Sequence, residues 1–322
     1  MPRVSETVLR SVAFLYPCRE EAEAHSKVGG TCFLIGHQII VDEIPQPAFV
    51  PYMVTAQHVL RNAGSTAIRI NRKDGGRPDI IELECHDWIP HPGGADLAIA
   101  PMSECIDQAI HDITYIQTRD FVTKEKIDKH KIGPGDEVFI SDRFLNHPGK
   151  GDDTAALRSG NISTRLETIW NKATQRDEES FALEMRSRTE SSGAPVVAYR
   201  TPATILSTDI ASRYFFCLLG VNWGYVFDKE TGENSWLNGI VPAWKIIETL
   251  EVPMLRENQQ AGIEEWMQAH LPKRGPLSVL NGTRTQSPSE APPHVNPQRA
   301  AASAPSATAR ERRLYRRFGL PD

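Results

Sequence analysis

Short runs of apolar or alternating residues recur from about residue 10 to residue 242, and turn-forming residues separate them. The runs are rich in Val, Ile, Phe and Thr, a composition that favours strands over helices. The expected strands are residues 12–16, 30–36, 38–41, 52–55, 67–71, 80–85, 97–101, 137–141, 156–163, 181–185, 195–199 and 215–223. Many short strands at this spacing predict an all-β fold of antiparallel sheets closed into barrels or sandwiches.

The strands fall into two groups, which we interpret as two antiparallel β-barrels at about residues 10–115 and 131–242. The polar stretch from Ser103 to His130 is expected to cross from one to the other. Clefts often form where two such units meet, because side chains from distant parts of a chain converge there. The sequence therefore predicts a site at the junction of the barrels.

The pattern changes after Pro242, where apolar residues recur at helical intervals and predict a closing helix over 242–251. Residues 1–252 would then form one domain, and an amphipathic stretch predicts a short helical extension over 253–273. Residues 274–322 are rich in Pro, Ala, Ser, Thr and Arg, and such a composition cannot bury enough apolar surface to offset the entropy of ordering. We expect a disordered tail there.

The tail ends in a basic segment with interleaved aromatic residues, although the whole chain has a net charge of −5. The segment contains Arg310, Arg312, Arg313, Tyr315, Arg316, Arg317 and Phe318. Such a cluster is suited to an acidic protein surface, an anionic lipid or a nucleic acid. The alternative is a tail that only keeps the protein soluble.

Composition is otherwise that of an ordinary globular protein, with 322 residues, 40% of them hydrophobic and 24% charged. No run is long enough for a membrane span, and the amino terminus lacks the apolar core of a signal peptide, so the mature protein is expected to begin near Met1. The five cysteines are scattered singly, without spacing typical of disulfides or zinc ligands. We expect a cytoplasmic protein without a bound metal or cofactor.

Three short motifs suggest chemistry when they are taken together. They are centred on His58 after Val54-Thr55-Ala56-Gln57, on Asp96 before Leu97-Ala98-Ile99, and on Ser192 before Gly193-Ala194-Pro195. A serine hydroxyl becomes a good nucleophile when an imidazole takes its proton and a buried carboxylate orients that imidazole. Each motif alone has an ordinary structural explanation, as a turn or a buried histidine. Their order and their domain-sized spacing favour a catalytic triad.

The chain resembles the trypsin-like serine peptidases, and among them the bacterial high-temperature-requirement (Deg-type) peptidases. The resemblance extends from about residue 10 to about residue 250. It is carried in sequence order by residues 30–36, 55–59, 96–99, 135–139, 160–163, 192–195 and 219–222. It implies the chymotrypsin fold and a His58–Asp96–Ser192 triad.

The resemblance also implies an oxyanion hole formed by the backbone N–H groups of Glu190 and Ser192. The family has glycine where this chain has Glu190, and a side chain there can bias the loop towards a collapsed hole. Ser191 stands where zymogens of the family carry an aspartate that pairs with a new amino terminus. We therefore do not expect activation by amino-terminal cleavage.

Substrate contacts are implied at two places. Arg186, six positions before Ser192, falls where the family has the floor of its primary pocket, and its guanidinium would favour an acidic substrate side chain. Alternatively, Arg186 simply points to solvent. Asn222, Trp223 and Gly224 match the edge segment that pairs with the substrate backbone.

Three functions from different classes follow. The first is a serine endopeptidase that acts through an acyl-enzyme intermediate on a protein or peptide substrate. The second is a peptidase-fold binding module whose site is inactive or gated by an effector, since a fold does not fix a function. The third is an unrelated β-rich interaction protein in which the three motifs coincide by chance.

Overall fold

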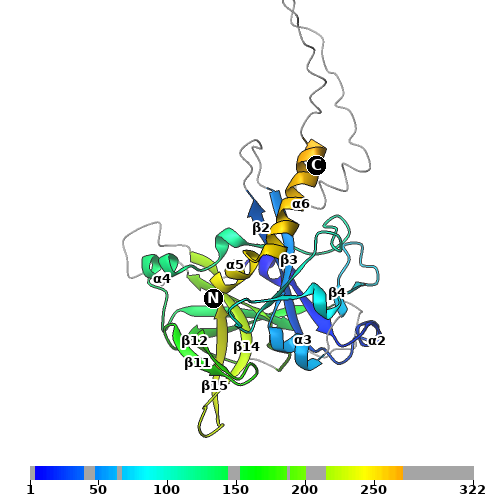
Figure 1. Ribbon diagram of the computed structural model, residues 1–322. Helices are drawn as coiled ribbons and strands as arrows, with labels where there is room; N and C mark the ends of the chain where they lie inside the picture. The colour runs from blue at the N-terminus through cyan, green and yellow to red at the C-terminus, as the bar shows by residue number, and fades with distance from the viewer. Residues whose placement is uncertain are drawn as a thin grey trace, which may run out of the picture.

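The computed structural model describes residues 4–39, 48–63, 67–143, 153–186, 189–200 and 215–270 (Figure 1). The predicted tail at 274–322, including its basic segment, lies outside the described residues. None of the helices in the described ranges has the length and hydropathy needed to cross a lipid bilayer.

The first of two sheets has eight strands, in the order β5-β4-β1-β2-β3-β7-β6, with β8 parallel to β2. Its strands are β1 Val12–Tyr16, β2 Gly30–Ile39, β3 Ala48–Thr55, β4 Ala67–Ile70, β5 Asp79–Glu82, β6 Ile89–Pro90, β7 Ala98–Pro101 and β8 Ile116–Gln117. β2 pairs with β1 from Gly30 to Phe33 and with β3 from Phe33 to Ile39. Leu15, Leu34, Met53 and Ile68 are fully buried inside this sheet.

The second sheet has seven strands, in the order β10-β9-β13-β14-β15-β12-β11. Its strands are β9 Glu137–Arg143, β10 Ala155–Ile162, β11 Glu167–Asn171, β12 Arg176–Met185, β13 Pro195–Arg200, β14 Phe215–Phe227 and β15 Asn234–Pro242. β10 also pairs with β12, and this pairing closes a barrel. The prediction of a mostly β fold built on two barrel-like antiparallel sheets is therefore confirmed, with the second sheet closed into a barrel and the first curled into a half-barrel.

One hydrophobic core runs through the junction of the two sheets. Phe33, Val54 and Ile99 from the first sheet belong to the same buried cluster as Val196 and Leu219 from the second. Burial of apolar surface across the junction holds the sheets against one another. The elements that carry the candidate site meet at this junction.

Helices cover the ends and edges of the sheets. They are α1 Glu6–Arg10, α2 Arg19–Glu23, α3 Gln57–Ala63, α4 Lys124–His130, α5 Trp244–Leu250 and α6 Pro253–His270, with single turns η1 Cys85–Asp87, η2 Thr118–Asp120 and η3 Thr189–Ser191. α5 lies between the two sheets in Figure 1 and contacts both β7 and β15. α6 packs on β3 and buries Leu255 completely.

Some strand predictions differ from the structure in detail. The expected break between 30–36 and 38–41 is wrong, because β2 continues to Ile39. The strand expected at 80–85 ends at Glu82, and the chain then turns through η1. β6, β8, β11 and β15 were not expected. β11 and the first four residues of β15 are largely exposed or partly exposed, and the buried part of β15 contains only the short apolar pair Ile240 and Val241, so neither strand has a long apolar run.

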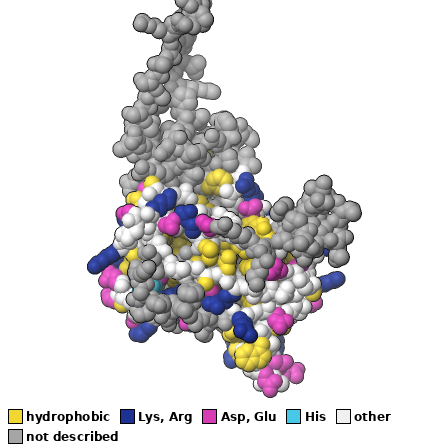
Figure 2. All heavy atoms as spheres, turned by 180° about the vertical axis from the view of Figure 1, so that it is seen from behind, with side chains coloured by type: hydrophobic (Ala, Val, Ile, Leu, Met, Phe, Trp, Pro, Cys, Tyr) yellow, Lys and Arg dark blue, Asp and Glu magenta, His cyan; other side chains and the backbone are white. Residues whose placement is uncertain are grey.

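Charged side chains of both signs alternate over the described part of the face in Figure 2, and hydrophobic side chains are exposed near its centre. This face therefore carries no strong field of a single sign that would steer a charged ligand.

Candidate active site

His58 and Asp96 lie side by side at the end of the first sheet. His58 is in the first turn of α3, directly after β3, and Asp96 immediately precedes β7. The β3–β7 pairing sets Thr55 opposite Ala98 and so brings the two residues together. Asp96 is fully buried, and the side chain of His58 is 16% exposed.

Two hydrogen bonds fix the orientation of this pair. The backbone N–H of His58 donates to Asp96 Oδ1 at 2.8 Å, and His58 Nδ1 lies 2.6 Å from Asp96 Oδ2. Because the carboxylate accepts a proton from Nδ1, the other ring nitrogen, Nε2, is left with its lone pair free. A general base that takes a hydroxyl proton needs this tautomer.

Two residues of the second sheet hold Asp96 from behind. Asn171 Nδ2 donates to Asp96 Oδ2 at 3.2 Å, and the backbone N–H of Asp96 donates to Glu178 Oε2 at 3.1 Å. Burial raises the pKa of Glu178, and the nearby charge of Asp96 raises it further. Neither supporting residue was identified from the sequence, since neither belongs to a motif and the pairing of β11 with β12 brings them here.

Ser192 lies in a tight turn between η3 and β13. The next residue, Gly193, has φ +86°, and a Cβ on it would lie 2.0 Å from the carbonyl oxygen of Thr31. Only glycine fits a left-handed position so close to another backbone. The N–H of Gly193 donates to the carbonyl of Asn222 at 2.7 Å, which fastens the turn to β14.

Thr31 of β2 fastens the same turn from the first sheet. Its N–H donates to the carbonyl of Ser192 at 2.9 Å, and its Oγ1 donates to the carbonyl of Glu190 at 2.8 Å. Thr55 Oγ1 in turn donates to the carbonyl of Thr31 at 2.8 Å. The turn that carries Ser192 is therefore docked on the end of β3, next to the start of α3 and His58.

Ser191 faces away from the cleft into the second barrel. It is fully buried, and its hydroxyl donates to Asp142 Oδ2 at 2.5 Å. Asp142, also buried, accepts from Arg158 Nε at 3.0 Å. Ser191 stands where zymogens of the resembled family pair with a new amino terminus. In this chain the residue at that position is hydrogen-bonded to Asp142 inside the barrel instead.

Among the described residues, no hydrogen bond joins Ser192 Oγ to His58. The Ser192 hydroxyl lies near Gly224, where a Cβ would be 3.5 Å from Oγ. Ser192 is 8% exposed. Distances between catalytic groups are often long before substrate binds, so the arrangement remains compatible with proton transfer from Ser192 to His58.

A cavity of about 280 Å³ opens beside Ser192. Its walls are mostly apolar and are formed by Asn171, Lys172, Ala173, Ser192, Trp223, Gly224, Tyr225 and Phe227. Lys172 Nζ lies 4.5 Å from the centre of the Phe227 ring. The cavity has the size and apolar lining of a site for a small or medium side chain.

The residues expected to bind substrate differ in where they lie. Trp223 and Gly224 line the cavity, whereas the buried Asn222 uses its side chain to donate to the carbonyl of Ser191 at 2.9 Å. The backbone of Asn222 is bonded to Gly193 and Ala194. Beyond Asn222, β14 pairs with β15 alone among the described strands, so from Trp223 onwards its other edge is open to an added strand. Arg186 is exposed and does not line this cavity.

No group of three or more His, Cys, Asp or Glu side chains in the described ranges is arranged to hold a metal ion.

Comparison with known proteins gives likeness of structure only. No protein-family model matches the sequence, and no curated protein sequence matches it. The similar solved structures include Deg5, with 12% identity and a TM-score of 0.42 over 75% of this chain and 88% of that one. They also include the Rv3671c protease of M. tuberculosis in its active form, with 17% identity and a TM-score of 0.37 over 76% of this chain and 80% of that one. A third is the HtrA-type protease AlgW with a decapeptide, with 16% identity and a TM-score of 0.35 over 80% of this chain and 66% of that one.

Proposed function

We propose that the protein is a serine endopeptidase. The observation that carries the proposal is the buried Asp96 carboxylate 2.6 Å from His58 Nδ1, next to the docked turn that presents Ser192. In this mechanism His58 Nε2 takes the proton of Ser192 Oγ as the oxygen attacks the substrate carbonyl. His58 then gives that proton to the leaving amine, and the acyl group stays on Ser192 until water, activated by the same imidazole, releases it.

The substrate would bind as an extended strand along the open edge of β14 that begins at Trp223 and Gly224. One of its side chains would enter the cavity formed by Trp223, Tyr225 and Phe227. The apolar rings favour an aliphatic or aromatic side chain, and Lys172 at the rim disfavours a basic one. An acidic preference through Arg186 has weaker support, because Arg186 does not line the cavity.

A gated site is the second candidate, and the local structure of η3 favours it. A 3₁₀ turn over Thr189–Ser191 closes through i→i+3 hydrogen bonds, which direct the N–H of Ser192 towards the carbonyl of Thr189. That amide would have to turn outwards to stabilise an oxyanion. Together with the absence of a Ser192–His58 hydrogen bond among the described residues, this conformation favours a site that substrate or an effector must complete.

A fluorophosphonate probe tests the proposal, because it reacts rapidly only with a serine activated by a base. We expect labelling of the full-length protein at Ser192, its loss in Ser192→Ala, and a fall of several orders of magnitude in His58→Ala. Ser191→Ala is the matched control and should still be labelled. Labelling that persists in Ser192→Ala would overturn the proposal. Labelling that appears only after a peptide is added would favour the gated site.

A further inference from the structure

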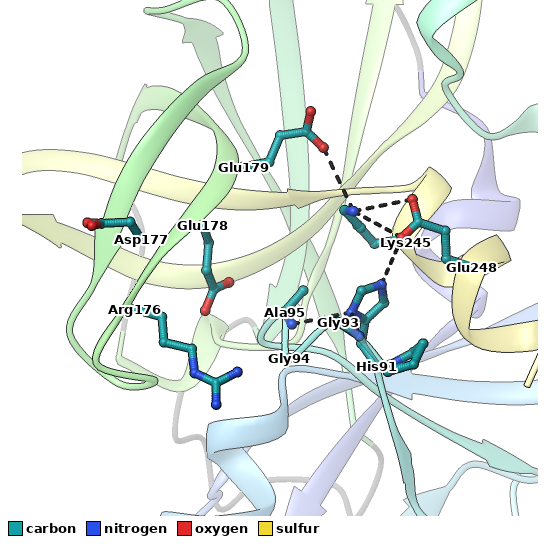
Figure 3. Close-up of a pocket in the computed structure, with 11 residues that line it drawn as sticks. His91, Gly93, Gly94, Ala95, Arg176, Asp177, Glu178, Glu179, Lys245 and Glu248 are labelled. Carbon is teal, nitrogen blue, oxygen red and sulfur yellow. Dashed lines mark hydrogen bonds and ion pairs between the residues drawn. The ribbon is translucent and has the colours of Figure 1, made fainter.

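His91 lies outside the proposed triad, yet it organises the turn that carries Asp96. It follows β6, is 5% exposed, and points into the interior of the turn formed by residues 91–97 (Figure 3). The N–H groups of Gly93 and Ala95 both approach its Nδ1, at 3.0 and 3.3 Å. The imidazole therefore occupies the centre of the turn.

Backbone hydrogen bonds close the same turn around the ring. His91 N–H donates to the carbonyl of Leu97 at 3.0 Å, and Gly94 N–H donates to the carbonyl of His91 at 2.9 Å. Asp96 lies between Ala95, whose N–H faces the imidazole, and Leu97, whose carbonyl accepts from His91. His91 therefore holds both residues that flank Asp96 in the sequence.

The contacts specify the protonation state of His91. A nitrogen that accepts from two N–H groups carries no proton, so the proton must be on Nε2. Nε2 lies 3.0 Å from Glu248 Oε2, and Glu248 is held in turn by Lys245 at 2.9 Å. Burial lowers the pKa of His91, which agrees with a neutral ring.

This arrangement connects the Asp96 turn to α5. In Figure 3 the dashed lines run from Ala95 through His91 to Glu248 and Lys245, along one wall of a cavity of about 240 Å³. Glu178, which accepts from the N–H of Asp96, lines the same cavity. α5 and β12 therefore hold the backbone of Asp96 from two sides.

We propose that His91 is a positioning residue for the reaction proposed above: its neutral imidazole fixes the Asp96 turn, and Glu248 anchors that imidazole to α5. The kinetic consequence of this inference rests on the proposed function. The structural consequence does not, because the orientation of His58 by Asp96 can be measured directly.

Two substitutions separate the contacts of the imidazole. His91→Asn retains an acceptor near the place of Nδ1 and loses the contact with Glu248, whereas His91→Gln reaches Glu248 and loses the acceptor inside the turn. We expect His91→Gln to lower kcat by about ten-fold or more with little change in KM, because small misplacements of a catalytic group are costly. His91→Asn should retain most of kcat.

His111 provides a matched control. It is also buried, its Nδ1 accepts from the N–H of Asp107 at 3.0 Å, and its Nε2 lies 3.1 Å from Asp79. None of these contacts involves the proposed triad. His111→Gln should therefore lower the melting temperature about as much as His91→Gln does, while kcat stays at the parent value.

The second readout is the proton NMR signal of His58 Nδ1–H, which a short bond to a carboxylate moves downfield. The signal is assigned by its loss in His58→Gln. It should shift or broaden in His91→Gln and persist in His91→Asn and His111→Gln. If His91→Gln does not fold, His91→Met replaces it, because methionine also removes the acceptor inside the turn, with the same expected fall in kcat and the same change in the signal.

Parent-like kcat and an unchanged His58 signal in His91→Gln would overturn the inference. Equal losses of kcat in His91→Gln and His111→Gln would overturn it too, since stability alone would then explain them. If the parent protein hydrolyses no peptide, the proposed function fails, and the NMR signal by itself decides the role of His91.

Discussion

The carboxyl group of Asp142 lies behind the turn that carries Ser192 and accepts from both Ser191 and Arg158. A buried acceptor of this kind is costly to remove, because its donors lose their partner without regaining water. The hydroxyl of Ser191 is completely buried, whereas Arg158 is 27% exposed and recovers part of its hydration. Asp142 therefore contributes mainly by holding Ser191.

We predict that Asp142→Ala lowers the free energy of unfolding by about 1–3 kcal/mol, measured by urea denaturation, and lowers kcat as well. Asp177→Ala is the control, because Asp177 forms an exposed ion pair with Lys229 at 2.9 Å. That variant should change stability by less than about 1 kcal/mol. Equal effects of the two substitutions would contradict a special role for Asp142.

The pH dependence of stability is a second prediction at the residue scale. Burial lowers the pKa of His91 in the folded protein, whereas in the unfolded chain it is about 6.5. The charged groups that act on the ring are both on α5: Glu248, whose contact raises the pKa, and Lys245, whose charge lowers it. As the pH falls through 6.5, the unfolded chain takes up a proton that the folded protein does not, so the free energy of unfolding decreases.

His91→Asn removes this titration. Its free energy of unfolding should therefore fall less steeply than that of the parent protein between about pH 7 and pH 5, measured by urea denaturation at each pH. The other titrating groups are common to both proteins and cancel in the comparison. Parallel curves would show that His91 takes up its proton equally well in the folded and unfolded states.

At the scale of elements, η3 connects the sequence most directly to activity. Thr189–Ser191 forms a 3₁₀ turn, and the carbonyl of Glu190 is held by Thr31. Glycine disfavours a regular turn by about 1 kcal/mol relative to alanine, because it loses more conformational freedom on ordering. Glu190→Gly should then ease the reorientation of the amides that stabilise an oxyanion.

We predict that Glu190→Gly keeps or raises kcat, measured on a short peptide, with the fold intact by circular dichroism. Glu233→Gly, in the exposed turn between β14 and β15, serves as the control for a surface glycine and should change nothing. A large fall in kcat for Glu190→Gly alone would mean that the carboxylate contacts substrate or holds the loop open.

The elements also show how much of the fold can be predicted from the sequence. Apolar runs predicted β1, β3, β7 and β13 because these strands bury most of their side chains, and a buried strand has a continuous apolar pattern. β11 is largely exposed, and β15 is buried only over its second half, where its apolar run is short, so neither strand has such a pattern. The order of the three motifs predicted that His58, Asp96 and Ser192 would converge, and the structure places them on adjoining elements at the junction of the sheets.

The supporting residues could not be predicted in this way. Asn171, Glu178 and Thr31 act through single contacts with a residue that is distant in sequence. Such contacts depend on the register of strand pairing and on how the sheets dock, neither of which leaves a local pattern. The role of Asn222 was also different from the one expected, since its side chain holds the carbonyl of Ser191.

At the scale of the whole molecule, each sheet completes the other's part of the site. Asn171 and Glu178 of the second sheet hold Asp96 of the first, and Thr31 of the first sheet holds the turn of Ser192 in the second. The site therefore depends on docking of the two sheets and on the buried core between them. Substitutions far from Ser192 that weaken this docking should lower activity.

The last prediction concerns the carboxyl-terminal region. α6 belongs to the folded unit, because Leu255 is fully buried and Tyr52 Oη donates to Asn258 Oδ1 at 3.3 Å. A chain that ends at His270 keeps these contacts and should retain the melting temperature and the hydrolysis of a short peptide. A chain that ends at Glu251 should melt roughly 5–10 °C lower, because it loses a buried leucine and its surroundings.

Comparison of the full-length protein with the chain that ends at His270 also tests the basic segment at Arg310–Phe318. If that segment docks on an acidic protein surface, the full-length protein should bind an immobilised acidic polypeptide at low salt and release it as salt is raised, whereas the chain that ends at His270 should not bind. Full-length protein in which the five arginines of the segment are changed to glutamine is the matched control for charge and should behave like the shortened chain. Equal retention of all three proteins would remove support for docking. A lower melting temperature of the chain that ends at His270 would mean that residues beyond α6 contribute to the folded unit.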